Sequence, residues 1–394
     1  MIERKKVALR FSLNSGFARQ IVRGIIAYTQ KHGPWEIDIR SEEPIAFSTW
    51  AELKKWKGDG IIAPAYQKEH LRMLAGKGIP VVTTSCPSEE IPFPAVTFDD
   101  AAIGKMAAEH LLEHNLDRFA FIGPKEWGYS IARCNGFIET LSDHGANCTK
   151  CWIRPATNAR QLNETWIESS YYLDALKQLV PPVGVFASND RVGYGILQAC
   201  RHLGLRVPED VCLLSVDNDE ILCNLANPHL SSIALSGEEF GYQAAAMLDT
   251  LMRGQPLENN HVVIPPRGVV LRNSSDFLTV EDRYVADALR YIRNHSGHFI
   301  DVSDVMSIMP ISRRSLERRF QDIVGHGVYK EISRCHIERA KELLEQTDRP
   351  VSHVARESGF NSTNRFEDTF RKETGLSATD YRKKIAARAR RKKK

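Results

Sequence analysis

Three polar residues of this chain follow short apolar segments, and their chemistry suits a ligand rich in hydroxyl groups. Asn14, Asp190 and Asp217 hold these positions, and Arg133 lies in a segment with a helical pattern. In open parallel sheets the carboxyl ends of the strands meet at one edge, where ligands bind, so we expect these side chains to converge. A carboxylate accepts hydrogen bonds from two hydroxyls, a guanidinium donates to two, and an amide does both. The set predicts a polyol-binding site.

Further side chains are candidates for the same site. Asn189 can both donate and accept hydrogen bonds, and Arg19 lies in the first helical pattern. Aromatic rings cover the apolar faces of sugars, although they more often belong to a core. The candidate platforms are Phe17, Trp127 and Tyr129. Structural roles remain open alternatives, because Asp217 can cap a turn and Arg133 can be a surface residue of a helix.

Motifs of enzymatic and metal chemistry are missing from the sequence. We find no GxSxG, no HExxH, no Walker A motif and no GxGxxG after a strand. The eight cysteines include one CxxC pair, Cys148 and Cys151, but no second CxxC that would complete a zinc site. We therefore expect no cofactor and no metal. An α/β sugar-processing enzyme is the alternative class, because the acidic residues could do acid–base work.

The first 270 residues alternate short apolar segments with amphipathic ones. Segment 7–11 predicts a strand and segment 17–32 a helix, and the cycle restarts at 119–123. Strands that alternate with helices predict βαβ units and parallel sheets, here in two lobes of an α/β fold. The predicted boundaries are about 5–116 plus 235–258 for lobe 1, about 117–232 plus 262–272 for lobe 2, 273–282 for a polar linker, 283–384 for an all-helical domain, and 385–394 for a basic, disordered tail.

Charge is unevenly divided along the chain. From Asp301 to the end there are 22 Lys and Arg against 14 Asp and Glu, whereas the first 300 residues have 31 against 35. A near-neutral body with a basic end predicts that this end binds a polyanion. No segment approaches the ~18 apolar residues of a membrane span. The start of the chain has no signal-peptide pattern, so we expect a cytoplasmic protein without a membrane partner.

A repeat with a period of 50 residues lies in the helical part. Segment 312–320 aligns with 362–370, and each copy begins with a serine that can cap a helix. Each copy also has an apolar residue four positions before a phenylalanine, and a short helix and turn precede it. This order predicts a helix-turn-helix, whose second helix fits the major groove. The candidate DNA-contacting residues are Arg313, Arg314, Glu317 and Arg318 in the first copy, and Thr363, Asn364 and Arg365 in the second.

One amphipathic helix, 334–344, connects the two copies and would fix the spacing of two reading helices in successive major grooves. The pattern resembles the AraC family over about 100 residues. The matching residues are 338–344, Val354, Ala355, Gly359, Phe360, Phe366, Phe370, Gly375, Tyr381 and Arg382. The resemblance implies a double helix-turn-helix domain that binds duplex DNA, regulates transcription and contacts RNA polymerase. A helical bundle with solvated charged faces is the alternative, but it would not demand a repeat with matched turns.

The first 270 residues resemble the LacI-type, periplasmic-binding-protein-like sensor fold. The matching segments are 96–100, 133–137, 186–190, 216–218 and 230–233. This resemblance implies that Arg133, Asp190 and Asp217 contact the ligand, that the lobes close on it, and that two sensors pair in a homodimer. The whole chain, with both parts in this order, resembles regulators of pentose use. This resemblance implies a pentose effector, with D-xylose as the first expectation and a different monosaccharide as the alternative. It also implies a protein that activates catabolic genes, with repression as the alternative.

Overall fold

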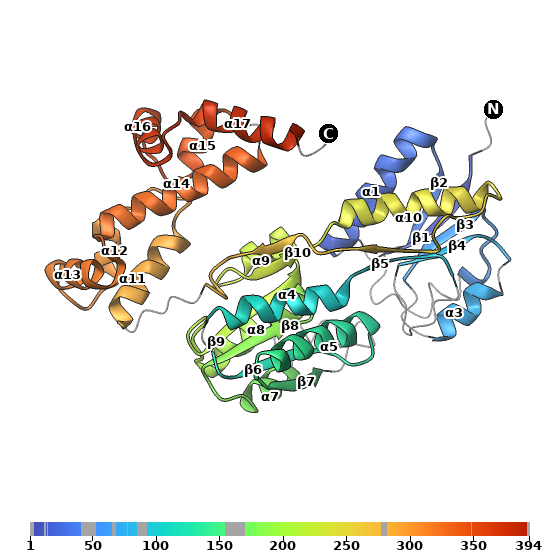
Figure 1. The fold of residues 1–394 in the computed structure, drawn as a ribbon, viewed down its shortest axis with the longest axis horizontal. Helices are drawn as coiled ribbons and strands as arrows, with labels where there is room; N and C mark the ends of the chain where they lie inside the picture. Colours follow the sequence, from blue (N-terminus) through green and yellow to red (C-terminus); the bar gives the residue numbers. More distant parts are fainter. Residues whose placement is uncertain are drawn as a thin grey trace. The chain divides into compact units, whose positions relative to one another are not determined.

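The computed structural model describes residues 4–11, 13, 15–40, 53–64, 68–76, 78–84, 93–114, 116–153, 170–276, 282–347 and 349–391. Its contacts divide the chain into two units, Met1–Phe277 and Leu278–Lys394. The N-terminal unit is α/β and the C-terminal unit is helical (Figure 1). Among the described residues, no helix is both long and apolar enough to cross a membrane.

The first sheet of the N-terminal unit has six parallel strands in the order β11-β5-β4-β3-β1-β2. Its central strands are apolar along their whole length because a parallel sheet is covered on both faces. β3, for example, is buried at every position. The strands are β1 (Lys6–Arg10), β2 (Glu36–Arg40), β3 (Gly60–Ala63), β4 (Val81–Thr83), β5 (Ala95–Phe98) and β11 (His261–Ile264).

The second sheet also has six strands, in the order β12-β10-β9-β8-β6-β7. All neighbours are parallel except β12, which runs antiparallel to β10 at one edge. Its strands are β6 (Phe119–Pro124), β7 (Cys148–Ile153), β8 (Val183–Ala187), β9 (Val211–Asp217), β10 (Ser231–Ala234) and β12 (Gly268–Val270). Two sheets in one unit confirm the predicted two-lobed α/β architecture.

Helices cover both sheets, as periodicity predicted. α1 (Gly16–His32) and α10 (Gly237–Met252) lie side by side on the first sheet (Figure 1). On the second sheet, α4 and α5 share one core with β6, β8 and β9, and α7 and α8 share another. The remaining helices of this unit are α3 (Lys68–Ala75), α4 (Asp100–Leu112), α5 (Gly128–Asp143), α7 (Ser170–Lys177), α8 (Asp190–Leu203) and α9 (Glu220–Leu225).

The predicted lobe boundaries are wrong for two elements. α4 was assigned to the first lobe, but it packs against α5, β8, β9 and β12 of the second. β11 was assigned to the second lobe, but it pairs with β5 of the first. The chain therefore changes lobes after β5, after β10 and after β11. An amphipathic pattern shows that a helix has a buried face, but it does not show which sheet that face covers.

The predicted linker also begins too early, because Ser274 and Ser275 are wholly buried in the sensor. The Ser274 hydroxyl donates to the Leu213 carbonyl over 2.7 Å and accepts from the Ser231 N–H over 2.8 Å. The Ser275 N–H donates to the Ser231 hydroxyl. Serines that satisfy buried backbone groups look like a polar linker in the sequence, although they are part of the core.

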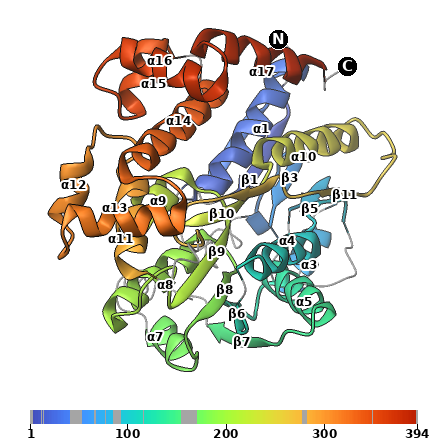
Figure 2. The same ribbon diagram turned by 60° about the vertical axis from the view of Figure 1, so that its left-hand side comes forward.

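Seven helices form the C-terminal unit in the described residues, in two halves with separate cores (Figure 2). α14 contributes Ile332 and Cys335 to the first core and Ala340 and Leu344 to the second, so it connects the halves as predicted. α17 continues as a helix to Arg391, where a disordered tail from 385 was expected; alanine and arginine are strong helix formers. The helices are α11 (Arg283–Asn294), α12 (Val302–Ser307), α13 (Arg313–Val324), α14 (Val328–Gln346), α15 (Val351–Glu357), α16 (Thr363–Thr374) and α17 (Ala378–Arg391).

Candidate effector cleft and nucleic-acid interface

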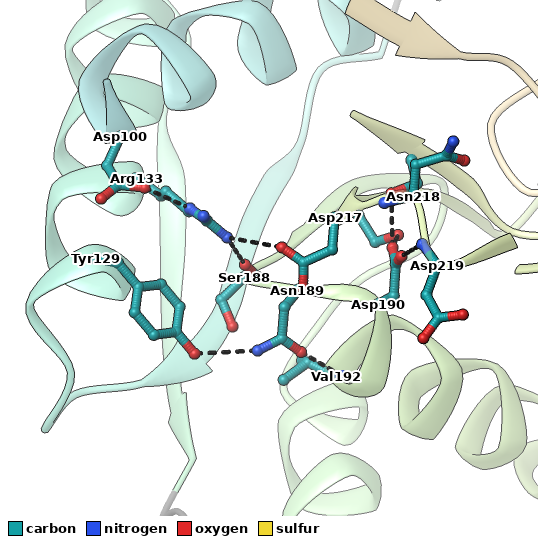
Figure 3. Close-up of polar contacts among 12 residues, drawn as sticks. Asp100, Tyr129, Arg133, Ser188, Asn189, Asp190, Val192, Asp217, Asn218 and Asp219 are labelled. Atoms are coloured by element: carbon teal, nitrogen blue, oxygen red, sulfur yellow. Dashed lines mark hydrogen bonds and ion pairs between the residues drawn. The ribbon is translucent and has the colours of Figure 1, made fainter. Parts of the chain in front are cut away.

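Arg133 on α5 lies between two aspartates, and the structure brings it close to Asp217 (Figure 3). Its Nε donates to Asp100 Oδ1 over 2.8 Å, and its Nη1 donates to the Ser188 carbonyl over 2.6 Å. The same Nη1 lies 3.9 Å from Asp217 Oδ1. Only 4% of Arg133 is exposed, so its charge depends on these partners, because an unpaired buried charge is costly.

Close packing of α4 against α5 explains the contact with Asp100. A Cβ on Gly136 would lie 2.3 Å from the Ala101 carbonyl oxygen, and a Cβ on Gly104 would lie 2.1 Å from the Arg133 carbonyl oxygen. Glycine at both positions therefore allows the two backbones to approach. Asp100, the first residue of α4, can then reach the guanidinium on α5.

Burial and charge act in opposite directions on the pKa values of Asp100, Arg133 and Asp217. Burial raises the pKa of Asp100 and of Asp217 above the usual range, although Arg133 opposes this for both carboxyls. Burial lowers the pKa of Arg133, but Asp100 and Asp217 more than offset it and raise that pKa. Hydroxyls that donate to Asp217 would favour its ionised form, so ligand binding and its ionisation are linked.

Asp190 has a different role from the one expected. It begins α8, is 2% exposed, and both of its oxygens accept from protein donors. Oδ1 accepts from the hydroxyls of Ser215 at 2.5 Å and Ser232 at 2.6 Å. Oδ2 accepts from the Asp219 N–H at 2.7 Å and the Cys223 thiol at 3.4 Å. Four donors fill the acceptor sites of a carboxylate, so this side chain positions the neighbouring turn and has no capacity left for a ligand.

Asn189, directly before Asp190, lies with the aromatic candidates. Its Oδ1 caps the N-terminus of α8, and its Nδ2 donates to the Tyr129 hydroxyl over 3.1 Å (Figure 3). The Arg133 guanidinium lies over the Tyr129 ring, 4.8 Å from the centroid. The Trp127 ring lies 5.6 Å from that of Tyr129. The structure therefore groups four of the predicted side chains around Arg133.

The candidates from the first lobe are less uniform. Asn14 lies outside the described residues. The Phe17 ring lies 5.5 Å from that of Phe98 and packs against the cores of both lobes, which is a structural position rather than an open platform. Arg19 donates to a backbone carbonyl of the preceding loop over 2.7 Å. It also lines a cavity of about 420 Å³ between the lobes, and Asp217 lines the same cavity.

Asp219 joins the two lobes and was not predicted from the sequence. Its Oδ1 accepts from the Leu222 N–H at the start of α9, and its Oδ2 accepts from the Gly16 N–H at the start of α1 over 2.9 Å. A Cβ on Gly16 would lie 2.3 Å from that carboxylate oxygen, so glycine is required for the contact. The available signal was an aspartate directly before a short helical pattern, which is a common cap.

The turn after β9 holds two residues other than glycine in the left-handed region, Asp217 at φ 111° and Asn218 at φ 51°. Asparagine tolerates this region, whereas such backbone strain costs roughly 1–3 kcal/mol at most other residues. The Asn218 N–H donates to the Ser232 hydroxyl over 2.9 Å, and the Asn218 Oδ1 accepts from Arg272 over 2.8 Å. Asp217, which carries the backbone strain, is also the predicted ligand contact, and strain of this kind is typical of functional sites.

The first candidate reading helix, α13, presents arginines to solvent. Ser312 caps it, and Leu316 and Phe320 are wholly buried in the core of the first half. Burial of this face leaves the opposite one exposed. The exposed candidates on it are Arg313, Arg314 and Arg318. Guanidinium groups pair with guanine edges in the major groove and with phosphates, so this face suits DNA.

The second candidate reading helix, α16, is oriented in the same way by Phe366 and Phe370, which are wholly buried. Arg365 donates to the hydroxyl of Tyr329 on α14 over 2.9 Å. This hydrogen bond lowers the pKa of Tyr329 and places Arg365 against the connecting helix. The exposed candidates on α16 are Thr363, Asn364 and Arg365.

Glu317 has a different role from the DNA contact that was expected. Its half-buried carboxylate accepts from the N–H of Val328, the first residue of α14, over 3.2 Å. Glu367, fifty residues later, accepts in the same way from the N–H of Ala378, the first residue of α17, over 3.4 Å. A negative charge at a helix N-terminus is favourable. The repeat therefore includes a glutamate that fixes each reading helix to the helix after it.

The CxxC cysteines lie on β7 as free thiols, Cys148 half-buried and Cys151 buried. Burial raises the pKa of Cys148 to about 12 and also raises that of Cys151, so both are protonated at neutral pH. Metal binding requires the thiolate. In the part of the chain that the structure describes, no group of three His, Cys, Asp or Glu side chains could hold a metal ion.

Both the sensor and the helix-turn-helix region of this chain match known protein families. Residues 6–99 match the family model of the XylR N-terminal domain, 108–275 that of the periplasmic binding protein-like domain, and 306–384 that of a helix-turn-helix domain. The solved "structure of xylose-binding transcription activator xylR" is 29% identical, with a TM-score of 0.72 over 97% of this chain and 98% of that one. A LacI family regulator from Enterococcus faecium, at 22% identity and a TM-score of 0.58, shares the sensor fold.

The fold and these matches define a sugar-responsive, DNA-binding transcription regulator rather than an enzyme. The xylose operon regulatory protein of Haemophilus influenzae is 32% identical over 388 residues, which are 96% of this chain and 98% of that protein. That of Escherichia coli K12 is 30% identical over 96% of this chain and 97% of its own length. The chain belongs to the family of xylose operon regulatory proteins. The class and fold predicted from the sequence are thereby confirmed.

Proposed function

We propose that this regulator binds D-xylose in the cleft between the sensor lobes and activates pentose catabolic genes in response. One observation carries the proposal. The Asp217 side chain, 22% exposed, lines the cavity, yet its ion-pair partner Arg133 lies 3.9 Å away, beyond hydrogen-bond distance. A partly buried carboxylate that has no closer donor among the described residues is suited to accept from ligand hydroxyls. The names of the relatives favour a xylose effector.

Each side chain has a proposed role in sugar binding. Asp217 accepts from two ring hydroxyls, and Arg133, held by Asp100, donates to a third oxygen. Asn189 provides a further donor and acceptor. Trp127 and Tyr129 cover the apolar face of the ring, and from the first lobe Arg19 and Asn14 complete the site as the lobes close. Asp190 and Phe17 support the site from the core.

The proposed DNA interface has two parts that read successive major grooves on one face of the duplex. The exposed arginines of α13 contact the first groove, and Thr363, Asn364 and Arg365 contact the second. We propose that the protein acts as a homodimer at the nucleoid, paired through its sensors, and that it contacts RNA polymerase. Sugar binding then changes the orientation of both DNA-binding units by favouring the closed sensor.

Calorimetric titration with D-xylose, D-ribose, L-arabinose and D-glucose tests the effector. We expect D-xylose to bind most tightly, and we expect Asp217→Ala to weaken its binding by at least a hundredfold, because two sugar hydroxyls then lose the carboxylate that accepts from them. Asp210→Asn, which breaks a surface pair with Arg206, serves as the control and should bind normally. Unchanged affinity in Asp217→Ala, or no binding of any pentose by the wild type, would refute the proposal.

Dimerisation and activation need separate measurements. Analytical ultracentrifugation of the full chain with and without D-xylose should show a dimer. A reporter gene behind a DNA site selected by the full chain from a random pool should respond to D-xylose with increased transcription. A monomer in both states would refute the first expectation, and a decrease in transcription would refute the second.

A further inference from the structure

We propose that Arg272 relays occupation of the effector cleft to the segment that leaves the sensor, through its hydrogen bond to Asn218. The inference rests on the proposed function in one respect, the contact between the effector and Asp217. Arg272 follows β12 by two residues and lies five residues before the end of the sensor unit at Phe277. The cleft turn and the exit of the sensor are therefore directly bonded.

The guanidinium of Arg272 makes two hydrogen bonds that fix its orientation. Nη2 donates to Asn218 Oδ1 over 2.8 Å, and Nη1 donates to the Leu230 carbonyl over 3.0 Å. A planar guanidinium bonded through both terminal nitrogens cannot follow one partner without disturbing the other. A displacement of the turn at Asn218 is therefore transmitted to Arg272.

The backbone of Arg272 is bonded just as firmly to β10. Its N–H donates to the Ser231 hydroxyl over 2.8 Å, and that hydroxyl donates to the Arg272 carbonyl over 2.8 Å. Ser274 and Ser275, next along the chain, are wholly buried and bonded to β9 and β10. Residues 272–275 form one fastened segment, which we call the exit segment. Its position depends on the same strands that end at the effector cleft.

The turn at the other end of this connection holds two residues in sparsely populated backbone conformations. Asp217 and Asn218 both have positive φ, and the structure keeps them there through hydrogen bonds to Ser232 and Arg272. Rotation of the peptide between the two residues would change ψ of Asp217 and φ of Asn218, and it would break the hydrogen bond from the Asn218 N–H to Ser232 that holds the turn beside Arg272. An effector that binds the Asp217 carboxylate favours one arrangement only if it binds that arrangement more tightly. Through Arg272, this preference becomes a preference for one position of the exit segment.

Arg272→Lys tests the relay, because lysine keeps the charge but cannot bond Leu230 and Asn218 with a rigid fork. Two quantities are measured on the full chain: the D-xylose affinity by calorimetry, and the affinity for a selected DNA duplex by fluorescence anisotropy with and without D-xylose. For Arg272→Lys we expect a D-xylose affinity within threefold of wild type. We also expect the sugar-dependent ratio of DNA affinities to fall at least fivefold toward one.

Hydrogen exchange distinguishes a relay through Arg272 from a merely structural role of this residue. In the wild type, D-xylose should change amide exchange in the exit segment as well as at Asp217. In Arg272→Lys the change at Asp217 should persist and the change in the exit segment should disappear. Arg206→Lys is the matched control and should behave as wild type in every assay, because exposed Arg206 also makes two side-chain hydrogen bonds, both to Asp210.

The outcomes separate the relay from the proposed function. If the wild type binds no pentose, the effector proposal fails. If it binds D-xylose and Arg272→Lys keeps the wild-type ratio of DNA affinities, the relay fails. Should Arg272→Lys not fold, Asn218→Ser removes the same hydrogen bond with the arginine still in place, and it must show the same loss of coupling. Wild-type coupling in that variant would overturn the inference.

Discussion

Replacement of Arg133 by methionine should destabilise the sensor strongly, and more strongly at high pH. The guanidinium lies 2.8 Å from Asp100 and 3.9 Å from Asp217, and all three groups are largely buried. With an effective dielectric constant of about 20, attractions at these distances are roughly 6 and 4 kcal/mol, and the cost of burying the guanidinium offsets much of this sum. Loss of one partner from a buried ion pair costs about 3–5 kcal/mol, which is the expected effect near pH 8.

The pH dependence of this effect has a definite sign. Without Arg133, the pKa values of Asp100 and Asp217, already raised by burial, rise further in the folded variant. The folded variant then binds protons that the unfolded chain has released, so its stability falls more steeply as the pH rises. At pH 5, protonation of these carboxyls relieves the repulsion. The loss there should be smaller than at pH 8 by at least about 1.4 kcal/mol, the equivalent of one pKa unit.

Urea titration followed by tryptophan fluorescence measures this loss in the full chain. All six tryptophans precede residue 277, so the signal reports on the sensor alone. Arg206→Met, which removes an exposed partner of Asp210, is the control and should change stability by less than about 1 kcal/mol at either pH. A loss below about 1 kcal/mol for Arg133→Met, or an equal loss at pH 5 and pH 8, would refute the reasoning.

Three further predictions follow from individual contacts. Gly16→Ala places a methyl group 2.3 Å from the Asp219 carboxylate, so it should break the contact between lobes and weaken D-xylose binding about tenfold in calorimetry; normal affinity would contradict this. Phe370→Ala should cost about 3–5 kcal/mol in the second half of the DNA-binding unit and abolish specific DNA binding in anisotropy, with an unchanged fluorescence transition of the sensor. Burial raises the pKa of Asp190 to about 6 despite its hydrogen bonds, so its contribution to stability is full below pH ~4 and is lost as the pH rises through about 6. Carbon NMR, assigned with Asp190→Asn, should show a carboxyl that titrates near pH 6 rather than near 4.

Local sequence patterns predicted the helices, the strands and the fold class, because the spacing of apolar residues along a few turns of chain indicates each element. The strand and helix alternation, the 50-residue repeat and the connecting helix α14 all depend on periodicity, which is visible over a few turns of chain. Asp217 was placed in the site because it ends β9, whereas Arg133, the sixth residue of α5, was placed there by the family resemblance. The sequence alone could thus place two residues that are 84 positions apart in one site.

The wrong assignments share one cause: the hydrogen-bond partner of each side chain is distant in the sequence or lies on another element. Asp190 has the type and position of a ligand contact, but Ser215 and Ser232, far away in sequence, supply donors that fill it. Glu317 lies on the outward face of its helix but reaches the start of the next one. Ser274 was assigned to a polar linker, because the sequence does not show that its hydroxyl bonds buried backbone groups of β9 and β10. Periodicity predicts the direction of a side chain, but it does not identify the residue that the side chain will contact.

The two helix-turn-helix copies share the residues that position a helix and differ in those that would read DNA. Both copies have a buried apolar pair, and Glu317 and Glu367 each cap the following helix. The exposed candidates for reading DNA are three arginines on α13, whereas on α16 they are Thr363, Asn364 and Arg365. Because arginine favours guanine whereas asparagine favours adenine, identical half-sites would leave one helix mismatched. The structure therefore predicts a binding site whose two halves differ in sequence, with guanines concentrated opposite α13.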